Sequence, residues 1–200
     1  MKKLHQYLGL VMLAPFIAWA ITGVFFFVKP GYKDAYASLS VKTYPLLNIT
    51  PITPQENWQE IRWLRTILGE HLLVKTDKHW QQLNPTNLKT IEQQTEQQTR
   101  LLIEDAIQTN PARYGKIESI DGQTVLMDSG VTINVNWPQM RLYQSGSDTD
   151  FINWMYKVHY LQWTGIQSVD RVLGIVGLGL VVLLAGLGLS MVIKRRRDDN

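Results

Sequence analysis

Apolar residues are concentrated at the two ends of the chain, in two runs that carry no charged side chain. The first run covers residues 8–28, which is 21 residues, and the second covers residues 172–193, which is 22 residues. At about 1.5 Å of rise per residue, a helix of either length crosses the roughly 30 Å hydrocarbon layer of a bilayer. The pattern therefore predicts two transmembrane helices, which we expect over residues 4–28 and 168–194.

Basic residues flank the two apolar runs at the chain ends. Six of the 20 Lys and Arg residues lie there, namely Lys2, Lys3, Lys194, Arg195, Arg196 and Arg197. The positive-inside rule then predicts cytoplasmic termini in a bacterial inner membrane, with residues 195–200 as a cytoplasmic tail and residues 29–150 in the periplasm. Between the basic ends, residues 4–193 hold 14 basic and 15 acidic side chains, which disfavours a nucleic-acid-binding protein.

A cleaved signal peptide is the alternative interpretation of the first apolar run. The basic start fits, and Ala18-Trp19-Ala20 has the small-x-small form of a cleavage site. The apolar run continues beyond this point through the aromatic residues 25–27, which makes it too long for the hydrophobic region of a signal peptide. We therefore favour a retained membrane helix.

The polar segment between the spans predicts one small α+β domain. Apolar side chains recur at helical spacing over residues 58–68, and we expect a second helix over residues 88–107. Residues 115–144 alternate between apolar and polar positions and contain Asp121-Gly122 and Ser129-Gly130 as turn signals, which predicts an antiparallel meander.

Residues 151–167 form a separate segment before the second span. Its tryptophan and tyrosine residues are typical of a membrane–water interface, and they include Trp154, Tyr156, Tyr160 and Trp163. We expect an amphipathic helix that lies at the periplasmic face of the membrane.

Histidine is the main candidate for redox or metal chemistry, because the chain contains no cysteine. His5 and His159 lie near opposite faces of the predicted membrane, where an ionisable side chain is a functional candidate. Contact with lipid head groups is the alternative role for both. His71 and His79 show no convincing ligand spacing, and we expect no metal site between them.

Small residues along both predicted spans favour a homodimer. Gly9 lies one helical turn after His5 and would leave room for a flat porphyrin beside an axial imidazole, although helix packing is the alternative. Other small residues allow close helix approach, namely Ala14, Ala18 and Thr22 in the first span and Gly174, Gly177, Gly179, Gly186 and Ser190 in the second. Because two spans enclose a cofactor poorly, we expect a dimeric four-helix bundle in which a histidine and its copy ligate one iron.

Motifs at both ends of the chain resemble the PepSY-associated transmembrane family. The first span has a basic start, H-x-x-x-G at His5 and Gly9, and a closing Thr22-Gly23 before aromatic residues. The last span is similar in its leading His159, its entry at Arg171 and Gly174, and its basic exit. The segment 113–143 resembles the PepSY-type hairpin of that family.

This resemblance implies b-type haem held by histidines of the spans, and electrons passed outward to ferric iron. Four-span relatives include haem-containing siderophore reductases, and the two-span length is similar to that of a small ferric reductase that supports ferrous iron uptake. We therefore expect His5 and His159 to ligate haem iron, with Gly9 beside the haem. The expected electron donor is a quinol or another protein.

The ferric substrate, either free iron or a ferric chelate, needs hard oxygen ligands. Asp148 and Asp150 precede the His159 segment and are the expected ligands, with a solvated acidic rim as the alternative. A different function also remains open, in which the protein has no enzymatic activity and its periplasmic domain binds a partner protein in the cell envelope.

Overall fold

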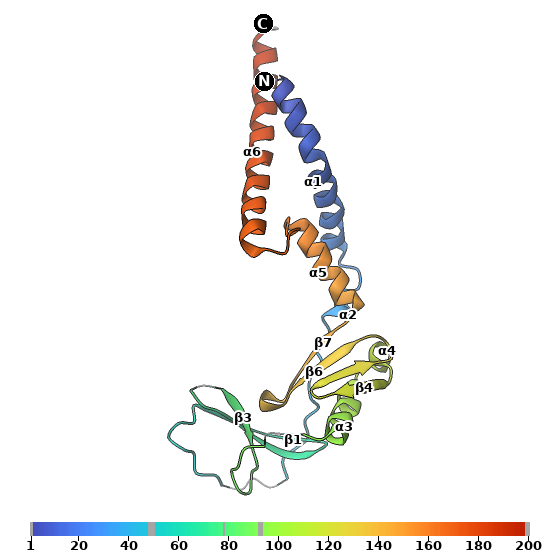
Figure 1. Ribbon diagram of the computed structural model, residues 1–200, viewed down its shortest axis with the longest axis vertical. Helices are drawn as coiled ribbons and strands as arrows, with labels where there is room; N and C mark the ends of the chain where they lie inside the picture. Colours follow the sequence, from blue (N-terminus) through green and yellow to red (C-terminus); the bar gives the residue numbers. More distant parts are fainter. Residues whose placement is uncertain (1, 48–50, 78, 92–93, 199–200) are drawn as a thin grey trace. The chain divides into compact units, whose positions relative to one another are not determined.

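The computed structural model describes residues 2–47, 51–77, 79–91 and 94–198. The chain forms two compact units (Figure 1). One is a helical unit of Met1–Lys33 with Thr149–Asn200, and the other is a β-rich unit of Asp34–Asp148. Each unit is treated separately below.

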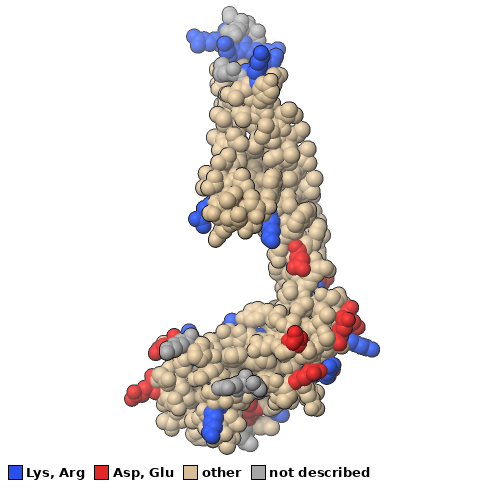
Figure 2. Space-filling view, viewed as in Figure 1, with Lys and Arg blue, Asp and Glu red and all other residues tan. Residues whose placement is uncertain are grey.

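Two long helices, α1 (Lys2–Val28) and α6 (Gln167–Asp198), dominate the helical unit. Only 11% of the most apolar stretch of each helix is buried within the chain, so most of its apolar side chains face outward. A helix of this length and exposure is suited to a bilayer and not to water. Figure 2 shows Lys and Arg side chains at both ends of this unit and uncharged surface between them. The prediction of two membrane helices flanking an α+β domain is confirmed.

A shorter helix, α5 (Ser147–His159), precedes α6 and replaces the amphipathic helix expected over residues 151–167. It begins four residues earlier than expected and ends eight residues sooner. Leu161 and Gly165 have φ angles of 56° and 74°, and this left-handed conformation ends the helix and turns the chain into α6. The short helix α2 (Tyr32–Ala35) follows α1.

The β-rich unit contains two antiparallel sheets, and its strands follow chain order in each. The three-stranded sheet has β1 (Glu60–Thr66), β2 (Gly69–Lys75) and β3 (Trp80–Leu83). The four-stranded sheet has β4 (Ile117–Asp121), β5 (Thr124–Met127), β6 (Thr132–Asn136) and β7 (Arg141–Ser145). The second sheet confirms the predicted meander over residues 115–144.

The helix predicted over residues 58–68 is wrong, because this segment forms β1 and the turn into β2. Thr66 pairs with Gly69, and Gly69 takes a φ of 106° that residues with a side chain rarely adopt. The hydroxyl of Thr66 accepts a hydrogen bond from the Leu68 backbone at 3.1 Å, which closes the turn. A short apolar run fits the periodicity of a helix as well as that of a strand. Pairing with the buried strand β2 decides in favour of a strand.

The second predicted helix is real but begins later than expected. Helix α3 covers Glu96–Ile107, and Thr95 is its N-cap. Thr95 and Gln98 form a reciprocal capping box, which satisfies backbone donors that would otherwise lack partners. Residues 88–91 instead lie outside any helix: Leu88, with a φ of 57°, ends the turn that follows β3, and Thr90 forms an isolated bridge with Leu83. The short α4 (Pro111–Tyr114) follows, and the 3-10 turn Trp137–Gln139 joins β6 to β7.

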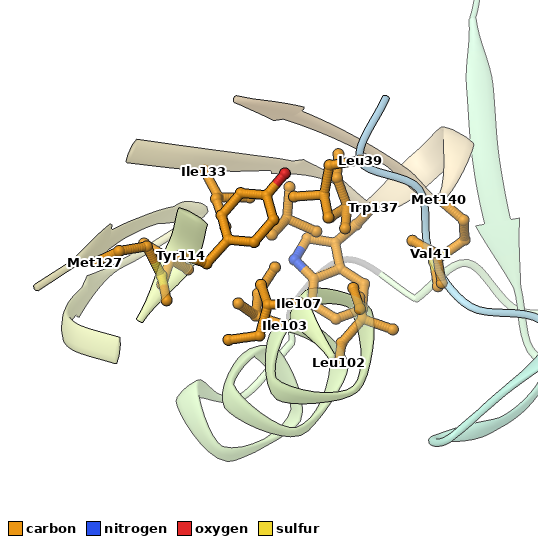
Figure 3. Packing of buried hydrophobic residues seen from close by; sticks show 14 of the residues in the cluster. Leu39, Val41, Leu102, Ile103, Ile107, Tyr114, Met127, Ile133, Trp137 and Met140 are labelled. Atoms are coloured by element: carbon orange, nitrogen blue, oxygen red, sulfur yellow. The ribbon is translucent and has the colours of Figure 1, made fainter. Parts of the chain in front are cut away.

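The core of the β-rich unit lies between α3 and the four-stranded sheet. Figure 3 shows side chains of α3 pointing toward the indole of Trp137 and the ring of Tyr114. The labelled members of this cluster are Leu39, Val41, Leu102, Ile103, Ile107, Tyr114, Met127, Ile133, Trp137 and Met140. A second cluster of Leu72, Val74 and Leu83 belongs to the three-stranded sheet.

Candidate functional site

His159, the last residue of α5, is held against α1 by three side chains of that helix. Its imidazole Nδ1 lies 2.8 Å from Oγ1 of Thr22. Its backbone carbonyl accepts a hydrogen bond from Nε1 of Trp19 at 2.7 Å. The ring of Phe26 meets the imidazole edge-on, with 5.1 Å between the ring centroids. Both the backbone and the ring of His159 are therefore positioned by α1.

The hydroxyl of Thr22 determines which nitrogen of His159 carries a proton. Thr22 is 2% exposed, and its Oγ1 lies 2.7 Å from the carbonyl of Ala18 and 3.3 Å from that of Trp19, so we assign its single hydrogen to the nearer carbonyl. Oγ1 can then only accept a hydrogen bond from His159, and we assign the imidazole proton to Nδ1. The neutral ring then has an unprotonated Nε2, which is the form that ligates a metal.

A cavity of about 420 Å³ opens beside His159 within the helical unit. Its lining consists of Trp19, His159, Tyr160, Leu161, Gly174 and Leu178. Apart from the His159 imidazole and the Tyr160 hydroxyl, these side chains are apolar, because the indole N–H of Trp19 is used on the His159 carbonyl. The described residues provide no hydrogen-bond partner for Nε2 of His159. The cavity therefore combines an available imidazole nitrogen with mainly apolar walls, in the size range of cofactor sites.

His5 lies near the other end of α1 and faces α6. Its Cε1 lies 3.5 Å from the position that a Cβ would occupy on Gly188. Its Nδ1 is buried and has no hydrogen-bond partner among the described residues. A buried polar atom without a partner costs free energy, which a ligand on that nitrogen would recover. A Cβ on Gly9 would meet nothing within 4 Å, so the space beside Gly9 is open.

His5 and His159 are not brought together within one chain. His159 contacts Thr22, which lies 17 residues after His5 in the same helix. Seventeen residues correspond to about 26 Å along a helix axis. Two imidazoles this far apart cannot ligate one iron, so each would need its own cofactor.

Asp148 forms an ion pair within the β-rich unit. Nη1 of Arg113 lies 2.7 Å from Oδ2 of Asp148, and the Arg113 side chain is only 7% exposed. The hydrogen bond to Asp148 raises the pKa of Arg113 above its ordinary value. Asp150 is exposed. Throughout the described residues, no three His, Asp or Glu side chains are gathered as a metal-binding group, and ferric ligation by Asp148 and Asp150 stays a prediction.

His71 is a buried residue of the three-stranded sheet and uses both ring nitrogens. Nε2 lies 2.7 Å from Oγ1 of Thr66, and Nδ1 lies 2.6 Å from Nε2 of Gln82. Burial penalises the charged ring and lowers the pKa of His71 to about 4. His79 is exposed between β2 and β3. His71 therefore has no nitrogen left for a metal.

The sequence model of one family, the PepSY-associated TM region, matches residues 2–199. The chain belongs to this family. The match includes both membrane helices, the two histidines near their ends and the domain between them, which confirms the resemblance seen in the motifs. Comparisons with curated proteins and with solved structures found no match.

The positioning of His159 by side chains of α1 was not predicted from the sequence. Thr22 was expected among the small residues of a dimer interface, whereas the structure buries it against His159 of the same chain. Trp19, Thr22 and Phe26 are separated by three and four residues, which places them on one helix face. That spacing, together with a hydroxyl in an otherwise apolar run, was the sequence signal that could have predicted a polar contact on this face of α1.

Proposed function

We propose that this protein is a haem-dependent ferric reductase of the bacterial inner membrane, which reduces periplasmic Fe(III) and supports ferrous iron uptake. The observation that carries this proposal is the placement of His159, whose Nδ1 lies 2.8 Å from the buried Thr22 hydroxyl and which lines a mainly apolar cavity. Histidines that ligate iron typically use one nitrogen for the metal and the other for such a supporting hydrogen bond. Family membership supports the proposal only as far as the fold and the membrane helices.

The residues around His159 fit a b-type haem. Haem supplies a one-electron Fe(III)/Fe(II) couple, whose potential depends on its axial ligands and its burial. Thr22 keeps the proton on Nδ1 and orients the ring, and Trp19 holds the backbone of His159 through its carbonyl. Leu161 and Leu178 provide apolar walls that exclude water. These contacts prepare Nε2 to ligate before any cofactor binds.

We further propose that the reductase is a homodimer. The described lining of the cavity contains one imidazole, and a six-coordinate haem iron takes two axial ligands. A second copy of the chain would supply the other imidazole across a two-fold axis. Bis-histidine ligation leaves no open position on the iron, which favours electron transfer over oxygen binding.

His5 is proposed as the ligand of a second haem near the cytoplasmic face. Its buried, unpartnered Nδ1 supports this role, as does the open space beside Gly9. With haems at both ends of α1, electrons from a cytoplasmic-side donor could cross the bilayer. With only the His159 haem, a quinol or another protein would have to donate on the periplasmic side.

The test is the visible spectrum and ferric-reductase activity of the purified full-length protein. We expect a Soret band that shifts with dithionite, and formation of a coloured Fe(II) chelate when Fe(III) is supplied. His159→Ala should lower the haem content per chain and abolish the activity. His79→Ala is the matched control, because His79 is exposed in the β-rich unit and should leave both readouts unchanged.

Two results would contradict this proposal, the first in the assignment of His159 and the second in the function itself. One is a His159→Ala protein that keeps full haem and full ferric reduction, which would remove His159 from the haem site. The other is a wild-type protein that is colourless and stays inactive after loading with haem. That second result would support a non-enzymatic envelope protein whose periplasmic domain binds a partner.

A further inference from the structure

A second and larger cavity, of about 930 Å³, lies at the start of α6. We call it the α5–α6 cavity. Its lining comes from the last turn of α5, the connecting segment and the first three turns of α6, all within the helical unit. The lining residues fall into a polar group near the connecting segment and an apolar group further along α6. Tyr160, Gly174 and Leu178 also line the His159 cavity, so the two cavities are neighbours.

The exposed charges in the α5–α6 cavity are positive. Lys157 and Arg171 line it and are both exposed. The carboxylate among the lining residues belongs to Asp170, which is only 7% exposed. Its Oδ1 accepts hydrogen bonds from Thr164, at 2.9 Å from the backbone nitrogen and 2.7 Å from Oγ1. Because the Asp170 carboxylate is already hydrogen-bonded to Thr164, the two cationic side chains are the charged groups that can contact a ligand. The positive end of the α6 dipole adds to the positive potential of the cavity.

The polarity of the cavity changes along α6. Arg171 lines the cavity near the start of α6, and the apolar side chains of Ile175 and Leu178 line it further along the helix. Seven residues separate Arg171 from Leu178, which is about 10 Å along the helix axis. Trp163, which is 56% exposed, lies at the polar end, where tryptophan is typical of a membrane interface. The cavity therefore suits an amphiphile with an anionic head and an apolar tail.

We propose that the α5–α6 cavity binds an anionic phospholipid from the bilayer. Lys157 and Arg171 contact the phosphate head group, and one acyl chain follows α6 past Ile175 and Leu178. A quinol head is neutral and would make no use of two cations, and a soluble phosphate would make no use of the apolar walls. The bound lipid lies next to the His159 cavity, because the two cavities share lining residues. This inference is independent of the proposed haem and is tested without it.

Tryptophan quenching measures this binding on the full-length chain. The protein is reconstituted in vesicles of phosphatidylcholine that contain brominated phosphatidylglycerol or, for comparison, brominated phosphatidylcholine. Trp163 lines the cavity, so the anionic lipid should quench it more strongly at the same mole fraction. Trp163→Phe should remove this difference, which assigns it to the α5–α6 cavity. Equal quenching by the two brominated lipids would overturn the proposal.

Charge variants identify the residues that bind the head group. The double variant Lys157→Gln, Arg171→Gln should weaken the apparent affinity for phosphatidylglycerol by about thirtyfold. Lys33→Gln is the matched control, because Lys33 is an exposed lysine of the same unit outside the cavity lining, and it should keep the affinity. An unchanged affinity in the double variant would overturn the proposal. So would displacement of the lipid by millimolar inorganic phosphate, which would identify a soluble anion as the ligand.

Discussion

At the scale of single residues, the buried hydroxyl of Thr22 sets the state of His159. Thr22→Val removes the acceptor for the Nδ1 proton while keeping the volume of the side chain, so the imidazole loses its fixed tautomer and orientation. If His159 ligates haem, the affinity for haem should fall about tenfold or more, because supporting hydrogen bonds at metal sites are typically worth that much. Haem per chain and the midpoint potential are the measurements.

Thr22→Ser separates the hydrogen bond from simple packing. Serine keeps the hydroxyl and should retain most of the haem and the wild-type potential. If the valine variant held haem at the wild-type potential, the hydrogen bond to Thr22 would have no part in ligation.

His71 makes the stability of the β-rich unit depend on pH. Its pKa is lowered from 6.5 to about 4 in the folded protein, so below pH 6.5 the unfolded chain binds this proton more tightly. The contribution of neutral His71 to the free energy of unfolding is therefore fully present above pH 6.5. It decreases as the pH falls toward 4, by about 3 kcal/mol in total. Urea unfolding of the full chain, followed by tryptophan fluorescence between pH 4 and pH 7, measures the decrease.

His71→Gln tests whether this histidine is responsible. The amide of glutamine can still pair with Thr66 or Gln82 but does not titrate, so the free energy of unfolding should depend less on pH in this window. A variant whose stability follows the same pH curve as the wild type would assign the effect to other groups.

At the scale of elements, α6 has two faces that carry small residues. One face packs within the chain: a Cβ on Gly177 would lie 2.6 Å from Cδ1 of Leu161, and one on Gly188 would lie 3.5 Å from Cε1 of His5. The opposite face carries Gly179, Gly186 and Ser190, which are exposed. This second face is available for a second copy of the helix.

Gly186→Leu should therefore weaken self-association by placing a bulky side chain on the outward face. The matched control is Ala185→Leu, which adds the same side chain about 100° around the helix. Sedimentation in mild detergent gives the oligomeric state, and haem per chain should fall together with the dimer. A wild-type protein that is monomeric yet fully loaded with haem would contradict ligation by two copies.

At the scale of the whole molecule, topology decides on which side of the membrane each site acts. The basic residues at both chain ends predict cytoplasmic termini and a periplasmic β-rich unit. A reporter that is active only in the cytoplasm should work when fused after Asn200. A reporter that is active only in the periplasm should work when inserted at Gly122, in the exposed turn between β4 and β5. The opposite pattern would place His5 and His159 on the wrong faces.

The distance between the two histidines also makes a prediction about electron flow. If haems at both ends relay electrons across the bilayer, His5→Ala should abolish ferric reduction by a cytoplasmic-side donor and lower the haem content by about half. If only His159→Ala abolishes the activity, a single periplasmic-side haem is enough. Activity with donors added on each side of sealed vesicles distinguishes the two arrangements.

The sequence by itself determined the features that rest on local patterns. An uncharged run of 21 or 22 residues has few alternatives to a membrane helix, and His5 and His159 are recognisable from their places beside these runs. The meander of β4–β7 was equally readable, because its strands alternate and its turns carry glycine. Each of these signals depends on residues that are neighbours in the chain.

Only the tertiary structure decided the features that depend on distant partners. Residues 60–66 form a strand because β2 pairs with them, although their spacing also fits a helix. Asp148 is an ion-pair partner because Arg113 is buried beside it, 35 residues earlier in the chain. The proton on His159 is assigned by Thr22, which is 137 residues away in sequence. Hydrogen bonds of this kind arise when helices pack, and periodicity within one segment carries no information about them.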